Sequence, residues 1–131
     1  MGKSTLGIVE KVKVKGAKEK TVLALVDTGA KLCSVDIKLA AETGIGPLKR
    51  TTKIKGAAKG KGTRRPVLGA HLELGGRKFD TEVNIADRSH MTFPVLIGRN
   101  VLTGNFTVDV EKGNDVFKSE AKRKSMEDEF E

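Results

Sequence analysis

The chain has 131 residues, which is enough for one domain and too few for two. Because Cys33 is the single cysteine, an intrachain disulfide is excluded. Met1 to Glu10 lacks the apolar core of a secretory signal, and no apolar stretch approaches the roughly 20 residues that a membrane-spanning helix needs. The net charge is +8, and residues 111–131 hold more acidic than basic side chains, so the rest of the chain is the more basic part. We therefore expect a soluble cytoplasmic protein that attracts anionic partners.

The N-terminal part predicts two strands that lead into a charged turn. Residues 6–15 alternate apolar and charged side chains from Ile8 onward, which indicates a strand with one face in water. Residues 21–26 are continuously apolar, as in a strand that is buried on both faces. Asp27-Thr28-Gly29-Ala30 follows at once. An ionised carboxylate in this place needs hydrogen-bond donors or a neighbour that shares its proton.

A short strand, a short helix and a basic segment come next. Residues 32–37 form a second apolar run, and residues 36–42 predict one or two helical turns, with Asp36 as the N-cap and Gly44 as the end. Lys49 to Arg65 contains eight basic residues, three glycines and no acid. This composition predicts an exposed, mobile hairpin or loop.

The second half predicts further strands. Val67 to Leu74 and Lys78 to Ile85 flank Gly75-Gly76, which is a strong hairpin signal. Residues 93–97 form a buried apolar run that ends at Gly98, and residues 99–102 predict a helical turn.

The C-terminal part predicts one last strand and a tail. Residues 106–110 alternate again, whereas the chain from Glu111 onward is charged and predicts a frayed helix or a disordered tail. Strands at this spacing without long helices indicate an all-β barrel or sandwich. We expect one domain at residues 1–110 and a charged tail at residues 111–131.

The Asp27 turn is the candidate catalytic element. Acid–base hydrolysis of a peptide needs one carboxylate to activate water and a second, protonated one to polarise the carbonyl group. Two carboxylates about 3 Å apart share a proton because both cannot ionise together. One such turn in a short chain therefore predicts a symmetric homodimer in which the Asp27 side chains of the two subunits meet on the two-fold axis.

Two segments resemble the paired signature of retropepsin-like aspartic proteases: Val26-Asp27-Thr28-Gly29-Ala30 and Val95-Leu96-Ile97-Gly98-Arg99. Residues 71–109 further resemble the family catalogued as ATP-dependent zinc proteases, which is retropepsin-like in fold and often associated with ligases that add glutamates to a ribosomal protein. The resemblance covers roughly residues 8–110. It implies an all-β, retropepsin-like acid-protease barrel with one or two short helices, a single domain, and a symmetric homodimer.

The resemblance also implies roles for individual residues. Asp27 would be the catalytic aspartate, Thr28 would brace its twin across the dimer axis, and Gly29 would line the substrate backbone. The apolar stretch before Gly98 would pack beneath this loop, and Arg99 would anchor the loop through an ion pair. Retroviral relatives have an acid two residues after the glycine, where this chain has Lys31, so we expect another partner for Arg99, with Asp36 and Asp109 as candidates.

The segment from Lys49 to Arg65 occupies the place where retropepsin-like folds carry the flap over the substrate, although a solvated loop is the simpler interpretation. If it is the flap, its charge faces the cleft and favours an acidic peptide. The predicted substrate-binding residues are Ala30, Lys53, Lys55, Lys59, Lys61, Arg64 and Arg65.

Neither a metal nor a cofactor is expected. The chain has two histidines and one cysteine and lacks HExxH and CxxC, so a zinc site would need an improvised set of carboxylates. The chain has neither a Walker loop nor a GxGxxG motif after a strand, so ATP binding is not expected. We expect Cys33 to pack as a small apolar side chain, and His71 and His90 to be structural or exposed.

Our first hypothesis is thus a cytoplasmic, homodimeric, metal-independent aspartic endopeptidase that acts on an acidic, glutamate-rich peptide or protein tail. The alternative is a non-catalytic binding module on the same scaffold that holds an acidic protein or RNA through its basic surface. A third hypothesis, an RNA-associated basic protein, is less favoured because the chain has five Phe, no Trp and no Tyr for base stacking.

Overall fold

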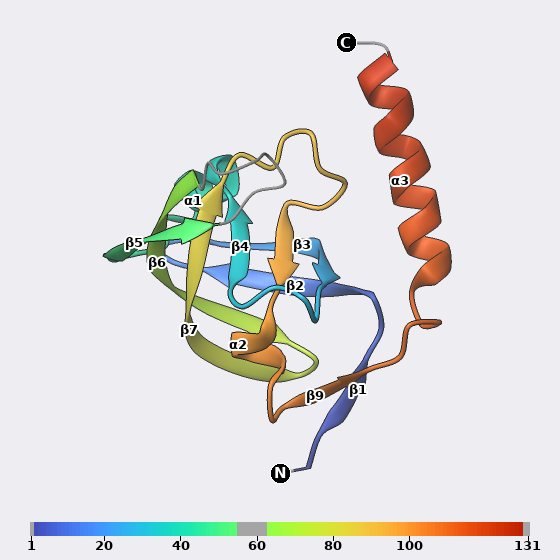
Figure 1. The fold of residues 1–131 in the computed structure, drawn as a ribbon, viewed down its shortest axis with the longest axis horizontal. Helices are drawn as coiled ribbons and strands as arrows, with labels where there is room; N and C mark the ends of the chain where they lie inside the picture. Colours follow the sequence, from blue (N-terminus) through green and yellow to red (C-terminus); the bar gives the residue numbers. More distant parts are fainter. Residues whose placement is uncertain (1, 55–62, 130–131) are drawn as a thin grey trace.

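Nine strands and three helices make up the part of the chain that the structure describes, a computed structural model covering residues 2–54 and 63–129 (Figure 1). The strands are β1 (Ser4–Leu6), β2 (Val9–Lys15), β3 (Glu19–Val26), β4 (Cys33–Asp36), β5 (Leu48–Ile54), β6 (Thr63–Leu74), β7 (Arg77–Ala86), β8 (Val95–Ile97) and β9 (Phe106–Val108). The helices are α1 (Ile37–Thr43), α2 (Arg99–Leu102) and α3 (Asn114–Glu129).

Six of the strands close into a barrel. The hydrogen-bonded order is β2-β3-β8-β4-β7-β6, and β6 pairs back onto β2, while β5 extends the sheet beyond β6. Small and branched apolar side chains fill the interior, among them Val12, Val14, Val35, Val83 and Val95, each fully buried. The predicted all-β barrel with short helices is confirmed. Closure leaves a barrel strand no free edge, so the short strands need no further cover.

Strand β3 departs from its prediction. Ala24 and Val26 lie in the core, but Leu23 and Leu25 are only half-buried. The expectation of burial on both faces is therefore wrong. A barrel has one interior, so alternate residues of β3 enter the core and the others face outward.

Local chemistry explains the first helix and the long hairpin, both of which were predicted. The carboxylate of Asp36 accepts the backbone N–H of Lys38 and caps α1, and Gly44 ends the helix with φ of +65°. Gly75 and Gly76, with φ of +59° and +74°, form the turn between β6 and β7. Both positions need positive φ, which matches a two-residue hairpin with the right-handed twist of its strands.

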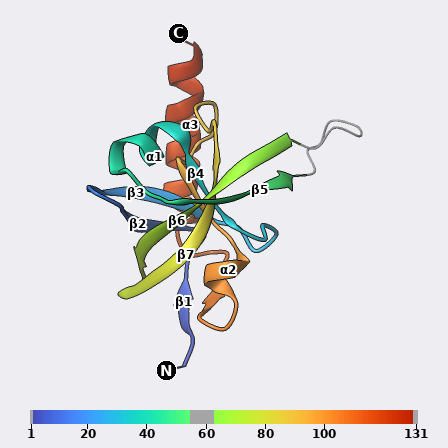
Figure 2. The same ribbon diagram turned by 90° about the vertical axis from the view of Figure 1, so that its left-hand side faces the viewer.

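The basic segment forms the arms of a second hairpin. Strands β5 and β6 are antiparallel, with Lys53 opposite Arg64, and they extend away from the barrel (Figure 2). Of the two predicted alternatives, a hairpin or a loop, the antiparallel pairing of β5 with β6 confirms the hairpin. Its tip, residues 55–62, lies outside the described residues, and so do the predicted substrate-binding residues Lys55, Lys59 and Lys61.

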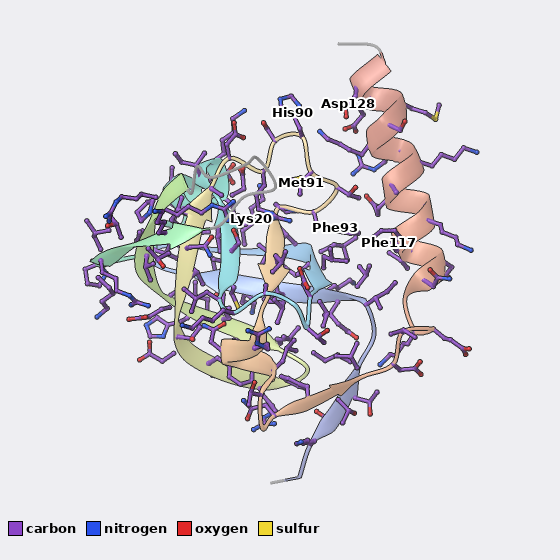
Figure 3. The ribbon with its side chains drawn as sticks, in the orientation of Figure 1. Lys20, His90, Met91, Phe93, Phe117 and Asp128 are labelled. Atoms are coloured by element: carbon purple, nitrogen blue, oxygen red, sulfur yellow. The ribbon has the colours of Figure 1, made fainter. Side chains whose placement is uncertain are left out.

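The C-terminal segment continues as helix α3, which lies beside the barrel. Phe117 of α3 packs on Phe93, which lies just before β8, with ring centroids 5.9 Å apart (Figure 3). Most other α3 side chains are exposed. This aromatic contact is the kind of anchor that lets a polar helix dock on a barrel.

Candidate active site

The two motifs separated by about 70 residues in the sequence meet because β3 and β8 are parallel neighbours. Val26 pairs with Ile97 at the carboxyl ends of these strands, and the N–H of Asp27 donates to the carbonyl oxygen of Ile97 at 2.9 Å. Asp27 and Gly98 therefore follow directly from adjacent strands. The sheet register, and not any local preference, brings them together.

A tight turn orients the Asp27 carboxylate. The backbone N–H of Gly29 donates to Asp27 Oδ1 at 2.8 Å, and the N–H of Ala30 reaches the Asp27 carbonyl oxygen at 3.3 Å. Asp27 is half-buried, and Thr28 and Gly29 are exposed. One carboxylate oxygen is thus held by the backbone, and the side chain stays at the surface, where a ligand or a second carboxylate can reach it.

Arg99 anchors this turn, but not through an ion pair. Its Nη1 donates to the carbonyl oxygens of Thr28 and Gly29 at 3.2 and 3.3 Å, and its backbone N–H donates to Ala30. In the described residues the two candidate partners are engaged elsewhere: Asp36 caps α1 and Asp109 accepts the N–H of Glu111. The predicted ion pair is therefore wrong. A guanidinium that binds carbonyl oxygens needs no acid, so Lys31 is compatible with an ordered turn.

Asn100 is a positioning residue that the sequence interpretation missed. Its Oδ1 accepts the backbone N–H of Cys33 at 2.9 Å, and its Nδ2 donates to Thr81 Oγ1 and to the Glu82 carbonyl oxygen at 3.0 and 2.8 Å. One side chain thus joins the end of the catalytic loop to β7. Its place directly after Gly98-Arg99 was the available signal.

Gly98 permits the close crossing of the two loops. A Cβ atom at this position would lie 2.5 Å from the carbonyl carbon of Leu32 and 3.0 Å from the carbonyl oxygen of Ala30. Real side chains do not approach backbone atoms so closely. Close packing against Leu32 and Ala30 therefore requires a glycine at this position.

Cys33 lies beneath the loop as a buried, protonated thiol. It is fully buried, its Sγ accepts the N–H of Gly98 at 3.3 Å, and burial raises its pKa to about 11. The thiolate is the nucleophilic form, so this residue is inert at neutral pH. Packing, as expected, is the role that these surroundings give it.

This burial leads to a test with a thiol reagent. In the native protein at pH 8 we expect iodoacetamide to modify Cys33 at least about 100-fold more slowly than in urea, because the reagent needs an exposed thiolate. Mass spectrometry of the intact chain over time measures both rates. Equal rates would contradict the buried position.

A cationic cavity of about 360 Å³ opens beside the catalytic turn. Four basic residues line it, and none of the described residues along its wall is acidic. The complete lining is Gly29, Ala30, Lys31, Leu32, Ser34, Thr52, Lys53, Arg65, Asn84, Arg88 and Leu96. Of the predicted substrate-binding residues it brings together Ala30, Lys53 and Arg65. Arg64 does not line it, and donates instead to Thr51 Oγ1 at 3.3 Å.

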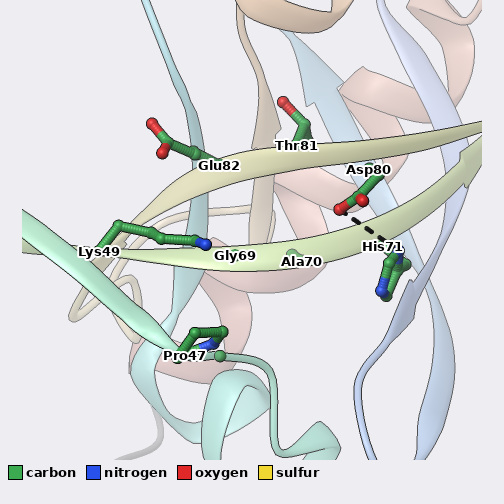
Figure 4. A pocket seen from close by; sticks show the side chains of 9 residues that line it. Pro47, Lys49, Gly69, Ala70, His71, Asp80, Thr81 and Glu82 are labelled. Carbon is green, nitrogen blue, oxygen red and sulfur yellow. Dashed lines mark ion pairs between the residues drawn. The ribbon is translucent and has the colours of Figure 1, made fainter.

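A second cavity, of about 410 Å³, lies away from the turn, between the start of β5 and the β6–β7 hairpin (Figure 4). His71 Nδ1 and Asp80 Oδ1 are 3.5 Å apart at its edge, and both side chains are exposed. Glu82 and Lys49 also line it, so its charges are mixed. It contains none of the residues of the Asp27 turn.

Across residues 2–54 and 63–129, no three His, Cys, Asp or Glu side chains gather in a group that could hold a metal ion. Among the described helices, none has the length and apolar character to span a membrane.

Comparison with solved structures identifies the fold. Lpg0085 from Legionella pneumophila subsp. pneumophila str. Philadelphia 1, a DUF785 protein of unknown function, is 22% identical with a TM-score of 0.58, over 82% of this chain and 94% of that one. EIAV protease in complex with the inhibitor HBY-793 is 20% identical with a TM-score of 0.58, over 72% and 83%. Simian foamy virus (mac) protease is 18% identical with a TM-score of 0.52, over 70% and 88%. The predicted retropepsin-like fold is confirmed.

The family comparison corrects one prediction. No curated protein sequence matches this chain at a significant level. The family model that matches is RimB-like, described as retropepsin-like aspartic endopeptidase RimB, over residues 37–115. The sequence predicted the ATP-dependent zinc proteases, which are a different family, so that prediction is wrong. That prediction was based on residues 71–109, which lie within the range that the RimB-like model matches. Since the match includes Gly98 and Arg99 and spans more than half of the chain, the protein belongs to the RimB-like family of retropepsin-like aspartic endopeptidases.

Proposed function

We propose that the protein is a cytoplasmic aspartic endopeptidase that forms its active site from Asp27 of two identical subunits and cleaves acidic peptides or protein tails. The observation that carries this proposal is the Asp27 turn, held by Gly29 and Arg99 and exposed beside a cationic cavity. Asp27 itself precedes the range matched by the family model, so its role rests on this geometry.

The proposed reaction divides the work between two Asp27 carboxyl groups. The ionised one removes a proton from water, whose oxygen adds to the peptide carbonyl carbon, while the protonated one donates its proton to the carbonyl oxygen. When the tetrahedral intermediate collapses, the C–N bond breaks and the nitrogen takes the proton that the first carboxyl group removed from water. The new carboxyl group of the product returns a hydroxyl proton to the second Asp27, which restores the shared-proton state. The Gly29 N–H fixes one oxygen of each carboxylate, so little reorganisation accompanies the proton transfers.

A homodimer is the first expected result. One chain supplies one Asp27, so a site with two carboxylates needs a second copy, and the exposed Thr28 is free to meet its twin. Light scattering at micromolar concentration should report twice the mass of the chain. A strict monomer over this range, with and without peptide, would remove the catalytic proposal and leave the binding module as the better interpretation.

A preference for acidic substrates is the second expected result. Lys53 and Arg65 line the cavity beside the turn, so an acidic peptide gains attraction there and a basic one is repelled. Matched glutamate-rich, neutral and lysine-rich peptides should be cleaved in that order. The preference should weaken with salt as the Debye length falls from about 10 Å at 0.1 M to about 3 Å at 1 M.

The control for this comparison is the Asp27→Asn protein, in which none of the three peptides should be cleaved. Equal rates for all three peptides with the unmodified chain would contradict the charge argument but not the catalytic one. Binding of acidic peptides without any cleavage would favour the alternative, a non-catalytic module that holds an acidic protein or RNA.

A further inference from the structure

Arg88 is a buried cation that neither the motifs nor the resemblance singled out. It follows β7, in the loop before β8, and only 8% of its surface is exposed. Its Nε donates to the Phe93 carbonyl oxygen at 3.0 Å, and its backbone N–H donates to Asp36 Oδ1 at 2.8 Å. No carboxylate of the described residues forms an ion pair with its guanidinium. The charges of Asp36 and Asp27 already offset part of the cost of this buried cation, and an anion in the cavity would add a direct ion pair to it.

The floor of the cavity holds a second group without a partner. Ser34 is 3% exposed, and its Oγ has no hydrogen-bond partner within the described residues. The sheet register places Ser34 beside both Asn84 of β7 and Leu96 of β8. A buried hydroxyl that lacks a partner in the folded chain is available to a ligand.

Arg65 completes the arrangement from the opposite side. It is half-buried on β6, and its Nη1 donates to Asn84 Oδ1 at 3.3 Å. The lining of one cavity thus includes Arg65, Arg88, Ser34 and Asn84, together with Gly29 and Ala30 of the Asp27 turn. Burial lowers the pKa of Arg88, with the nearby Arg65 charge as a smaller cause, whereas the charges of Asp36 and Asp27 raise it. A carboxylate bound by both Arg88 and Arg65 would relieve the repulsion between them. Guanidinium and hydroxyl donors match the planar, acceptor-only carboxylate.

We propose that this cavity is a carboxylate subsite, in which Arg88, Arg65 and Ser34 bind a carboxylate of the peptide close to the bond that is cleaved. This inference rests on the proposed function and deepens it, because it assigns selectivity to a defined pocket in the barrel wall as well as to the basic hairpin. The carboxylate belongs either to a glutamate side chain or to the end of a peptide, and the two sources are separable.

The test is a binding measurement that needs no catalysis. The full-length Asp27→Asn protein is titrated with three small probes, and amide chemical shifts of Ser34 and Asn84 are followed by NMR. N-acetylglutamate amide carries the side-chain carboxylate, N-acetylglutamine amide is its neutral isostere, and N-acetylalanine carries only a terminal carboxylate. We expect the glutamate probe to bind at least about tenfold more tightly than the glutamine probe, because hydrogen bonds to charged groups are the strong ones. The stronger of the two carboxylate probes identifies the source.

Variants assign the effect to the cavity. Arg65→Gln and Arg88→Gln should each weaken binding of the carboxylate probes about tenfold and leave the glutamine probe unchanged. The matched control is Arg50→Gln, which removes the same charge from the same hairpin, at a residue that pairs with Glu82 and does not line the cavity. Ser34→Ala should lower carboxylate affinity severalfold without loss of stability, because its Oγ has no partner to lose.

A purely structural role for Arg88 would lower the affinity for all probes alike. If Arg88→Gln does not fold, Arg65→Gln and Ser34→Ala decide the question, with folding checked by circular dichroism. A glutamine probe that binds as tightly as both carboxylate probes, or unchanged carboxylate affinity in Arg65→Gln, would overturn the subsite. If the subsite is overturned but the unmodified protein cleaves peptides, the proposed function stands without it. If the carboxylate probes bind selectively but the unmodified protein cleaves no peptide, the subsite stands and the catalytic proposal is overturned.

Discussion

Replacing Asp27 with asparagine is expected to lower peptide cleavage by about 1,000-fold or more, since the reaction needs one carboxylate as base and one as acid. Asparagine has the same size and keeps an oxygen that accepts the Gly29 N–H, so the turn should persist. The kcat for a glutamate-rich peptide, together with the circular dichroism spectrum and the thermal midpoint, measures both effects.

The matched control is Asp109→Asn. Asp109 Oδ1 also accepts a backbone N–H two residues ahead, from Glu111, but it lies beyond β9 and outside the cationic cavity. Its rate should be unchanged. A chelator should also leave the rate of the unmodified protein unaltered. Full activity in Asp27→Asn, or activity lost in chelator and restored by zinc, would contradict the two-aspartate mechanism.

Gly98→Ala is expected to destabilise the fold by about 3 kcal/mol, at the upper end of the usual cost of overpacking. The added methyl group would meet backbone atoms of Leu32 and Ala30, which cannot move aside as a flexible side chain can. The loop that carries Asp27 must shift, so activity should fall as well. The midpoint of urea unfolding gives the loss of stability.

The control for this substitution is Gly2→Ala, because nothing lies within 4 Å of a Cβ at Gly2. Its free energy of unfolding, obtained from the same measurement, should stay within about 0.5 kcal/mol of that of the unmodified protein, as it does for most surface substitutions. A Gly98→Ala protein as stable as this control would show that the two loops do not cross as closely as described.

Local chemistry made several elements predictable. The Asp36 cap with Gly44 encloses α1, and Gly75-Gly76 joins β6 to β7, because caps and tight turns depend on residues a few positions apart. The carboxylate turn at Asp27 was also recognisable, since its donor is the N–H two residues ahead. The acidic substrate, the homodimer and the catalytic role of Asp27 remain predictions.

Other features depend on which strands become neighbours. Alternation identifies a strand but not its partner, so the parallel pairing of β3 with β8 and the closure of β6 onto β2 do not follow from it. The outward Leu23 and Leu25 are a consequence of that closure. Arg99 illustrates this limit: the resemblance implied an acidic partner, but its guanidinium instead donates to carbonyl oxygens of the Asp27 turn.

By itself, then, the sequence determined α1, the helical turn after Gly98, the Gly75-Gly76 turn, most strand positions and the carboxylate at the end of β3, because each depends on neighbours along the chain. It did not indicate β1, and it left α3 open between a frayed helix and a disordered tail. Only the tertiary structure decided which polar and basic side chains line the cavity beside the Asp27 turn. Ser34, Arg65 and Arg88 lie on three different segments, and Arg88 stands in a polar loop where nothing predicts burial. Their convergence depends on strand register and loop packing, which are long-range interactions that no local pattern encodes.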